Sequence, residues 1–430
     1  MRTKASFKIE SVPTFKDSLL EWGQQFKEVI WLDSNGHTDS YGSFDALLAV
    51  KAHDFLRVDG QNGFEVLAHY QKKTADWIFG YLSYDLKNEV ERLESNNFDG
   101  LGFPQLYFFR PQKIVGIKGN RAYFLYLQEQ RDDIHHDFTA ISNFRSGRAT
   151  QASPINIKMR IFKDAYYNKI EQILEHIRRG DIYEVNFCQE FYAENVVIDP
   201  FSIYGRLNSI SRPPFASFFK WDGMYLLSAS PERYLKREGG KIISQPIKGT
   251  AKRSTDTTED GYLKAALEQD RKERAENIMI VDLVRNDLSK SAIKGSVAVE
   301  ELCKVYSFAQ VHQMISTVTA QVPLSIGSVE IIKETFPMGS MTGAPKVSAM
   351  KIIEELEVTK RGLYSGAVGY FAPNGDFDLS VVIRSILYNA AKKYVSFSVG
   401  SAITAKSVPE KEYEECLLKA RAMREVLEGG

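Results

Sequence analysis

Short apolar runs separated by turn-forming residues dominate roughly the first 145 residues. The runs EVIWLD, WIFGYL, LYFF and YFLYL each lie beside Gly, Asn, Pro or charged positions. Runs of this length with these boundaries predict β-strands. The stretch 131–154, RDDIHHDFTAISNFRSGRATQASP, is polar and rich in Ser and Gly, which predicts a junction. We therefore expect an N-terminal region of residues 1–148 and a second region of residues 149–430 that share one continuous core.

The second region mixes helical and strand patterns. Apolar residues recur at helical spacing before Gly180, which predicts a helix that ends there: Tyr166, Ile170, Ile173, Leu174 and Ile177. IYEVNFCQEFYA alternates like a strand, and the dipeptides Asp222-Gly223 and Gly239-Gly240 predict hairpins. LSVVIRSILYNA and YVSFSVGSAITA flank the polar turn AAKK and predict another antiparallel pair, and EKEYEECLLKARAMREVL predicts a final helix. Together these patterns predict an α+β fold with large antiparallel sheets.

Charge and composition exclude several classes of protein. The 430 residues carry 55 Lys plus Arg and 55 Asp plus Glu, so the net charge is zero, and we expect no nucleic-acid and no membrane-surface partner. No apolar run reaches the about 20 residues that span a bilayer, and MRTKASFKIESV lacks the apolar core of a signal peptide. Cys188, Cys303 and Cys416 form no CxxC pair. These features predict a cytoplasmic protein with reduced thiols, without a disulfide framework or a zinc site.

Glu232 and Lys248 flank a predicted hairpin in SASPERYLKREGGKIISQPIKGT. A buried lysine with a lowered pKa is a nucleophile, and a carboxylic acid facing it could protonate a leaving hydroxyl. A solvated charge at a strand end explains the same lysine equally simply. The spacing alone leaves both interpretations open.

Two pairs of glutamates repeat an i, i+3 spacing on predicted helices. They are Glu273 and Glu276 in DRKERAENIMIVDLVRNDL, and Glu412 and Glu415 in EKEYEECLLKARA. Residues at this spacing share one helix face, and two such pairs could hold a hard cation such as Mg²⁺. Solvated helix faces with salt bridges to neighbouring Arg and Lys are the alternative.

The segment FPMGSMTGAPKVSAMKIIEELE has a Gly/Ser/Thr-rich turn that opens a predicted helix. Such a turn can bind an anion through backbone N–H groups and the helix dipole, although its glycine spacing is not that of a Walker A loop. Arg384, in the strand-like run SVVIRSI, suits bidentate carboxylate binding if it points inward. A structural ion pair fits Arg384 as well.

Taken in order, these segments resemble one family. SASPER, PIKGT, AENIMIVDLVRNDL, FPMGSMTGAPK, LYSGAVGYF, VVIRSI and EYEECLLKARA resemble the motifs of chorismate-utilising enzymes, which include the large components of anthranilate and aminodeoxychorismate synthases. These motifs cover roughly residues 160–425, and WLDSNG and GYLSYDL resemble the N-terminal region of the same components. The resemblance implies an α+β fold whose large antiparallel sheets pack as a sandwich with helices outside.

The resemblance also implies a ligand set. Glu232 matches the general acid of the family, and Mg²⁺ would lie between the two glutamate pairs and bridge to the ring carboxylate. The implied magnesium ligands are Glu273, Glu276, Glu412 and Glu415. The implied chorismate-binding residues are Thr250, Thr342, Gly343, Tyr364, Arg384, Gly400, Ser401 and Lys419.

The branch of the family is implied by two positions. Lys248 resembles the nucleophile of the aminodeoxychorismate branch, where anthranilate synthases usually have a small residue. Isochorismate synthases carry a lysine base where this chain has Glu184. The resemblance thus implies that Lys248 attacks C2 of chorismate while Glu232 protonates the leaving C4 hydroxyl. Ammonia then adds at C4 to give 4-amino-4-deoxychorismate, on the route to 4-aminobenzoate and folate.

Two positions depart from the family pattern. Gln313, which we retain as a catalytic candidate, stands where many members have His, and Ser401 stands where a second Gly is usual. Cys188 lies in a strand-like run, and no glutaminase triad is evident. The resemblance therefore implies that a separate glutamine amidotransferase subunit supplies the ammonia.

Three other readings stay open at this point. The chain could be an anthranilate synthase component, an isochorismate synthase, or a chorismate-binding subunit without catalysis. Whether the N-terminal half binds tryptophan also stays open, because WLDSNG with SYGSF fits a plain turn at a sheet edge as well.

Overall fold

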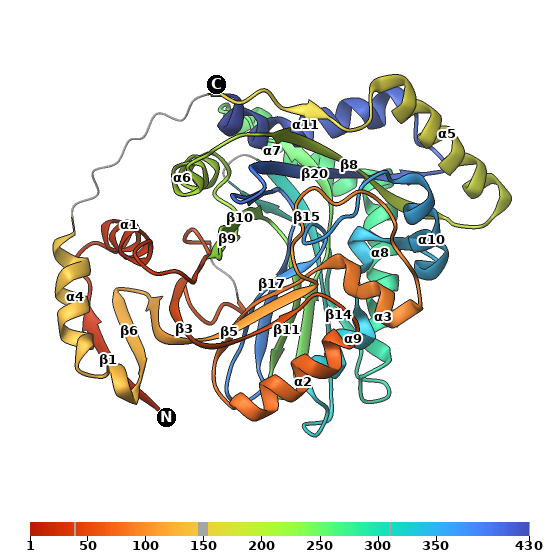
Figure 1. Cartoon of the computed structure of the whole chain (residues 1–430). Helices are drawn as coiled ribbons and strands as arrows, with labels where there is room; N and C mark the ends of the chain where they lie inside the picture. Colours follow the sequence, from red (N-terminus) through yellow and green to blue (C-terminus); the bar gives the residue numbers. More distant parts are fainter. Residues whose placement is uncertain (38–39, 145–153, 309–310, 430) are drawn as a thin grey trace.

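The strands join into one network in which every pair of named strands is antiparallel (Figure 1). The computed structural model describes residues 1–37, 40–144, 154–308 and 311–429. One series of hydrogen-bonded neighbours runs through β1 (Arg2–Lys8), β6 (Arg121–Leu127), β5 (Leu106–Lys118), β3 (Ala46–Val58), β2 (Val29–Asp33), β9 (Phe215–Trp221), β10 (Met224–Ser230), β19 (Ser385–Asn389), β20 (Tyr394–Thr404) and β8 (Glu184–Glu194). Two short strands end this series beside β8: β7 (Lys158–Met159) and β16 (Gly343–Ala344).

A second series begins at β5, which also pairs with β4. It runs through β4 (Ile78–Leu82), β17 (Ala367–Phe371), β18 (Phe377–Val381), β11 (Arg233–Glu238), β12 (Lys241–Gln245) and β15 (Val311–Gln321). Strand β15 pairs along one edge with β12 and then β13 (Ile247–Lys252), and along the other with β14 (Ala298–Ser307). Strands from before residue 145 and after residue 153 thus alternate in one network, since β2 pairs with β9 and β4 with β17.

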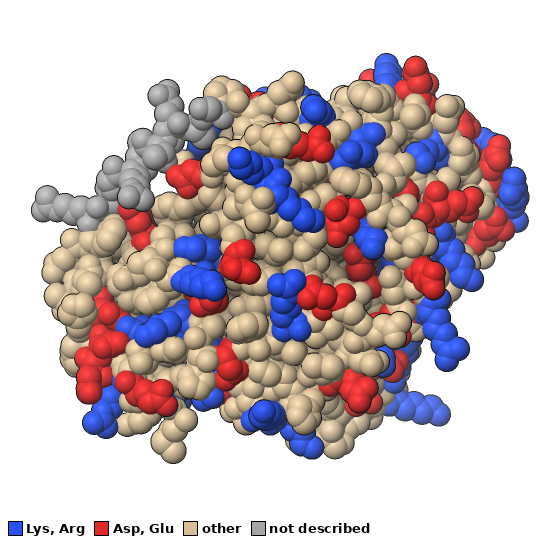
Figure 2. Space-filling view, viewed as in Figure 1, with Lys and Arg blue, Asp and Glu red and all other residues tan. Residues whose placement is uncertain are grey.

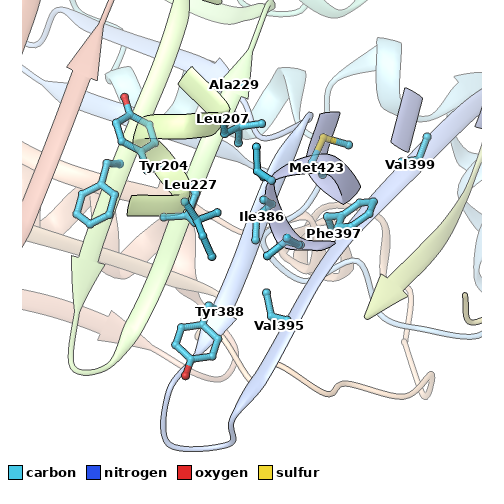
Figure 3. Packing of buried hydrophobic residues seen from close by; sticks show 14 of the residues in the cluster. Tyr204, Leu207, Leu227, Ala229, Ile386, Tyr388, Val395, Phe397, Val399 and Met423 are labelled. Carbon is cyan, nitrogen blue, oxygen red and sulfur yellow. The ribbon is translucent and has the colours of Figure 1, made fainter. Parts of the chain in front are cut away.

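Alternation along the strands of the first series separates two hydrophobic clusters. In β10, Leu226 belongs to a first cluster, which also includes residues of the second series of strands. Leu227 belongs to a second cluster, which lies between the first series and the helices that cover it. Adjacent residues of a strand point to opposite faces, so this series is apolar on both faces. Figure 3 shows part of the second of these clusters, where Leu227, Ile386 and Phe397 of three strands pack with Met423.

Helices cover the outer faces of the two series (Figure 1). Those contributing to the cluster over the first series are α1 (Val12–Gly23), α4 (Asp133–Asn143), α5 (Lys163–Arg179), α6 (Pro200–Ser211), α10 (Lys346–Leu356) and α11 (Pro409–Glu428). Those associated with the second are α2 (Gly63–Thr74), α3 (Lys87–Glu91), α7 (Thr257–Gln269), α8 (Arg271–Ser289) and α9 (Ser328–Thr335). The predicted α+β fold with large antiparallel sheets and outer helices is confirmed.

Local predictions from the sequence are largely confirmed. Helix α5 ends at Arg179, and Gly180 follows in the left-handed conformation with φ of 84°, which an L side chain disfavours. The hairpins at Asp222-Gly223 and at Gly239-Gly240 are present as β9–β10 and β11–β12. Strands β19 and β20 also pair as predicted.

Two local predictions are wrong. The polar stretch 131–154 is not all junction, because α4 occupies Asp133–Asn143 and buries Ile134 and Ile141 on one helical face. Its many polar residues hide this short amphipathic pattern. The run LSVVIRSILYNA is not one strand, because β18 ends at Val381 and β19 begins at Ser385. The predicted boundary at residue 148 lies outside the described residues.

The surface carries both signs of charge. On the face drawn in Figure 2, Lys and Arg side chains lie interspersed with Asp and Glu. Within the described part of the chain, none of the helices has the length and apolar character required to cross a membrane.

Candidate active site

A cavity of about 1230 Å³ brings together most of the residues singled out in the sequence. Its walls come from β13, β15, β20, α8, α11 and the segments that precede β11 and β19. The predicted site residues that line it are Glu232, Lys248, Thr250, Glu273, Glu276, Gln313, Tyr364, Arg384, Gly400, Glu415 and Lys419. Four predicted residues do not line it: Thr342, Gly343, Ser401 and Glu412.

Glu232 is a buried acid at the start of β11. Its backbone N–H donates to Ser230 Oγ at 3.3 Å, and its carbonyl accepts from Val381 N at 3.0 Å. Burial raises the pKa of its carboxyl to about 7, although the nearby Ser340 hydroxyl and Lys248 ammonium oppose the shift. A carboxyl with this pKa is part protonated near neutral pH, as a general acid requires.

Lys248 lies in an ion pair that the sequence did not reveal. Its Nζ is 2.9 Å from Oε1 of Glu184, the first residue of β8. Burial alone lowers the pKa of Lys248, but the charge and hydrogen bond of Glu184, with Glu276 and Glu232 beyond, raise it above its ordinary value. The lowered pKa expected from desolvation is therefore wrong, because the strand pairing places a carboxylate beside the amine.

Arg384 presents an unpaired guanidinium to the cavity. It stands between β18 and β19 with φ of 51°, a conformation that is uncommon for a residue with a side chain. Among the described residues its guanidinium has no hydrogen-bond or ion-pair partner, and burial lowers its pKa. The structural ion pair left open by the sequence is thus not formed within the described chain. A partly buried cation without a partner favours a carboxylate ligand.

Lys419 supplies a second cation from α11. Its Nζ contacts Glu415 Oε1 at 2.6 Å and donates to the carbonyl of Gly400 at 3.1 Å. Gly400 has no room for a side chain, because a Cβ there would lie 2.2 Å from Asn186 Oδ1. This close approach brings α11, β20 and β8 together at one end of the cavity.

Lys272 lies within electrostatic reach of both glutamate pairs, three of whose four members line the cavity. Lys272 Nζ lies 3.7 Å from Glu276 Oε1. Burial lowers the pKa of Lys272, but the negative charges of four carboxylates more than offset this effect and raise it: Glu276, Glu273, Glu412 and Glu415. Glu412 is buried, and its Oε2 has no hydrogen-bond partner among the described residues. In the part of the chain that the structure describes, no three His, Cys, Asp or Glu residues group closely enough to hold a metal ion.

The turn before α10 contributes different residues from those predicted. Ser340 and Met341 line the cavity, whereas the Thr342 hydroxyl donates to the carbonyl of Gly339 at 3.2 Å within the turn. Gly343 packs against β8 so closely that a Cβ would lie 2.2 Å from the carbonyl oxygen of Glu184. Through these contacts Thr342 and Gly343 pack behind the cavity wall and do not line the cavity.

Strand alternation separates two further predicted positions. Gln313 of β15 lines the cavity beside Thr250, its partner in β13, and the preceding His312 points away to Asp260, Nε2 to Oδ1 3.1 Å. Ser401 follows Gly400 in β20, is buried, and its hydroxyl has no partner among the described residues. Because adjacent strand residues face opposite sides, Ser401 points away from the cavity.

Comparison with known proteins places this arrangement in a family. Residues 19–425 match the family described as chorismate binding enzyme. The chain belongs to that family. Aminodeoxychorismate synthase component 1 of Escherichia coli is 37% identical over 312 residues, which span 73% of this chain and 65% of that protein. Anthranilate synthase component 1 of Thermus thermophilus is 33% identical over 365 residues, which span 82% and 77%.

A solved structure of the chorismate binding family agrees with the fold. The crystal structure of anthranilate synthase component I from Streptococcus pneumoniae matches with a TM-score of 0.79 and 25% sequence identity, covering 90% of this chain and 94% of that chain. Relatives from both synthase branches are thus similar to this chorismate binding chain, and the comparisons leave the reaction open.

Sequence reasoning missed two residues of this chorismate binding enzyme that the structure places at the site. Lys272 carries a signal that could have found it, because it adjoins Glu273 and lies four residues from Glu276 on one helix. Ser340 carries no such signal, since its approach to Glu232 depends on the fold. A second cavity, of about 440 Å³, is lined by residues 32–34 and 42–47 together with Arg233 and Tyr370, so the WLDSNG and SYGSF segments do meet.

Proposed function

We propose that this chain aminates chorismate at C4 to give 4-amino-4-deoxychorismate. The observation that carries the proposal is the presence of Lys248 and Glu232 in one cavity, with the pKa of the Glu232 carboxyl raised to about 7. A nucleophilic amine and a protonated acid are the two groups that displacement of a poor leaving hydroxyl requires.

The substrate would be held by the cations around the cavity. Chorismate carries two carboxylates, and Arg384 and Lys419 are cations from different elements that line the same space. The guanidinium of Arg384, which has no partner among the described residues, suits a bidentate contact. Tyr364, which is buried and lines the cavity, adds a hydroxyl on the Arg384 side.

The chemical steps balance with these groups. The free amine of Lys248 forms a C–N bond at C2 while both ring double bonds shift and the C4–O bond breaks. Glu232 gives its proton to the departing hydroxyl, so water leaves. Ammonia then forms a C–N bond at C4, the lysine amine departs from C2, and the ionised Glu232 takes a proton from the new ammonium. The product retains its enolpyruvyl group because nothing in these steps breaks that ether.

The carboxylates of α8 and α11 match a magnesium ion in the chemistry of their donor atoms. All are oxygen donors, the set that Mg²⁺ prefers, and Glu412 has a buried oxygen without a hydrogen-bond partner among the described residues. Glu273, Glu276, Glu412 and Glu415 would hold the ion after moving closer together, because no three of them group closely enough for a metal among the described residues. A bound Mg²⁺ would offset the negative charge of a substrate carboxylate. Lys272 and Lys419 provide positive charge to these carboxylates in the structure described here.

Ammonia is proposed to come from a separate glutamine amidotransferase subunit. The word component in the name of the Escherichia coli relative is consistent with a partner. Cys188 has the wrong surroundings for a glutaminase nucleophile, since burial raises the pKa of its thiol to about 12 and a nucleophilic cysteine needs a low pKa.

Anthranilate synthesis is the second candidate. Anthranilate synthase component 1 of Thermus thermophilus is similar over more of this chain than the Escherichia coli aminodeoxychorismate relative is, 82% against 73%. In that reaction Lys248 would form no covalent bond to the substrate. The reaction would end with the loss of pyruvate and the formation of an aromatic product.

Product analysis separates the two. The purified chain is incubated with chorismate, Mg²⁺ and an ammonium salt, and products are identified by chromatography and mass. A non-aromatic product with an amino group in place of a hydroxyl supports the proposal, and Lys248→Ala should then abolish it. Anthranilate from the wild type, or unchanged amination by Lys248→Ala, would overturn the proposal.

A further inference from the structure

Glu184 lies directly behind Lys248 in the cavity wall. The 2.9 Å contact joins Glu184 Oε1 to Lys248 Nζ, and the side chains are 2% and 12% exposed. Lys248 lines the cavity, whereas Glu184 does not. The carboxylate therefore holds the ammonium from the side opposite a bound substrate.

The backbone of Glu184 is fixed on both sides. In the strand register Glu184 is opposite Thr404 of β20 on one edge and Ala344 of β16 on the other. The neighbouring Gly343 permits this approach, because any larger residue would place a Cβ 2.2 Å from the carbonyl of Glu184. A side chain held between paired strands keeps its direction, so the carboxylate is a fixed partner of the amine.

One oxygen of this carboxylate is unused. Glu184 Oε2 is buried and has no hydrogen-bond partner among the described residues. A buried carboxylate oxygen without a hydrogen-bond partner is costly, and it leaves an open position where the carboxylate can accept a proton. The pair can therefore exist either as ammonium and carboxylate or as amine and carboxylic acid.

We infer that Glu184 accepts the proton of Lys248 and so frees its amine for attack on the substrate. This inference rests on the proposed amination. The proton moves from Nζ to the carboxylate, and the amine lone pair then forms the bond to C2. When ammonia displaces the lysine, the amine departs with its electron pair and takes the proton back from Glu184. Each cycle begins and ends with the ion pair, and no further reagent is consumed.

The surrounding charges favour the ammonium form of Lys248. Lys248 faces carboxylates from four directions: Glu184 on β8, Glu232 before β11, Glu273 and Glu276 on α8, and Glu415 on α11. Against the effect of burial, this field raises the pKa of Lys248. Lys248 is therefore held as an ammonium, and its amine becomes free only after a proton leaves. An internal acceptor delivers the amine without first losing the proton to water.

Replacement by the isosteric amide tests the inference. Glu184→Gln keeps a hydrogen-bond acceptor beside Lys248 but cannot take its proton. We expect kcat to fall about 10²- to 10⁴-fold, with little change in the KM for chorismate because Glu184 does not line the cavity. Glu184→Asp keeps a carboxylate and should recover part of the rate.

The pH profile separates proton transfer from packing. In Glu184→Gln, Lys248 must lose its proton to solvent, so kcat should rise about tenfold per pH unit below pH 7, where the wild-type kcat should be flat. A uniform loss of rate at every pH, or a wild-type rate, would overturn the inference. Glu190→Gln is the matched control, because Glu190 is a buried acid of β8 paired with Arg160 at 3.0 Å. It should change stability and leave the slope unchanged.

The outcome distinguishes this inference from the proposed function. If the wild type makes the aminated product and Lys248→Ala does not, the function stands whatever Glu184→Gln shows. If the wild type makes no aminated product, the function fails first. The rate at which trinitrobenzenesulfonate labels Lys248, followed by mass spectrometry, then tests the ion pair independently of turnover. We expect faster labelling in Glu184→Gln.

Discussion

Arg361 and Glu357 form a buried ion pair beneath the active-site cavity, with Nη2 and Oε1 2.6 Å apart. The same guanidinium donates to the carbonyls of Met341 and Asn186, at 2.6 and 2.7 Å. Both of those residues line the cavity. The Glu357 carboxylate in turn accepts from the backbone N–H of Cys188 at 2.9 Å. One buried pair thus ties the turn before α10 to β8, and so holds the two walls that meet at Glu184.

Removing the arginine should cost much of the stability of the protein. Arg361→Ala leaves the Glu357 carboxylate buried without its cation, and we expect the free energy of unfolding to fall by about 3–5 kcal/mol. Urea denaturation measures this. Arg179→Ala is the control, because Arg179 pairs with Glu175 at 3.4 Å on the exposed face of α5 and such a pair contributes about 0.3–0.5 kcal/mol. Equal losses in the two variants would contradict a structural role for Arg361.

Glu232 should make stability fall as the pH rises. Burial raises its pKa from 4.5 to about 7, so between these values the unfolded chain has released the proton and the folded chain retains it. Stability is then fully present below pH 4.5 and declines through pH 7, by about 3 kcal/mol at most. Glu232→Gln removes this contribution. Its free energy of unfolding, relative to the wild type, should increase across this window, and a constant difference would refute the assignment.

Arg384 should affect substrate affinity more than folding. Arg384→Lys keeps a cation but loses the bidentate fork, and hydrogen bonds to charged groups contribute about 1.5–3 kcal/mol. We expect the KM for chorismate to rise about 10- to 100-fold. The free energy of unfolding should change little, because the guanidinium has no partner in the described chain. Unfolding and steady-state kinetics on the same preparation check both statements, and a stable variant with unchanged KM would exclude Arg384 from substrate binding.

Gly343 should tolerate no side chain. A Cβ at this position would lie 2.2 Å from the backbone of Glu184 and 2.9 Å from Ala349 Cβ. Gly343→Ala must therefore displace β16 from β8, and we expect a loss of stability of about 1–3 kcal/mol. Gly205→Ala is the matched control, since Gly205 lies in α6 with nothing within 4 Å and should gain about 1 kcal/mol. Thermal unfolding that shifts both variants in one direction would contradict this account.

Magnesium should be needed for turnover and not for folding. A chelator should abolish product formation and leave circular dichroism unchanged, and added Mg²⁺ should restore activity. Glu276→Gln removes one oxygen donor and should raise the Mg²⁺ concentration required for half-maximal rate about 10- to 100-fold. Glu410→Gln, an exposed residue of α11, should behave as the wild type. Full activity in the chelator would remove the metal from the proposal.

Patterns of apolar and turn-forming residues along the chain were enough to predict much of the fold. The helix ending at Gly180 and the hairpins at Asp222-Gly223 and Gly239-Gly240 follow from local spacing and turn chemistry. The break at Arg384 could not be read in this way, because an apolar strand-like run continues through it. Helix α4 was hidden for the opposite reason, since its polar residues outnumber the few that it buries.

The sequence by itself determined which residues are candidates for the chemistry, because Glu232, Lys248 and the helical glutamates stand in motifs that resemble those of the family. Only the tertiary structure decided how these groups are paired. Glu184 and Lys248 lie on separate strands far apart in the chain. The two-residue period of a strand shows that neighbouring side chains face opposite sides, but it does not show which side faces the cavity. For that reason the sequence did not show that Ser401 and Thr342 lie outside the cavity lining, or that Arg384 lines the cavity with no partner for its guanidinium in the described part of the chain.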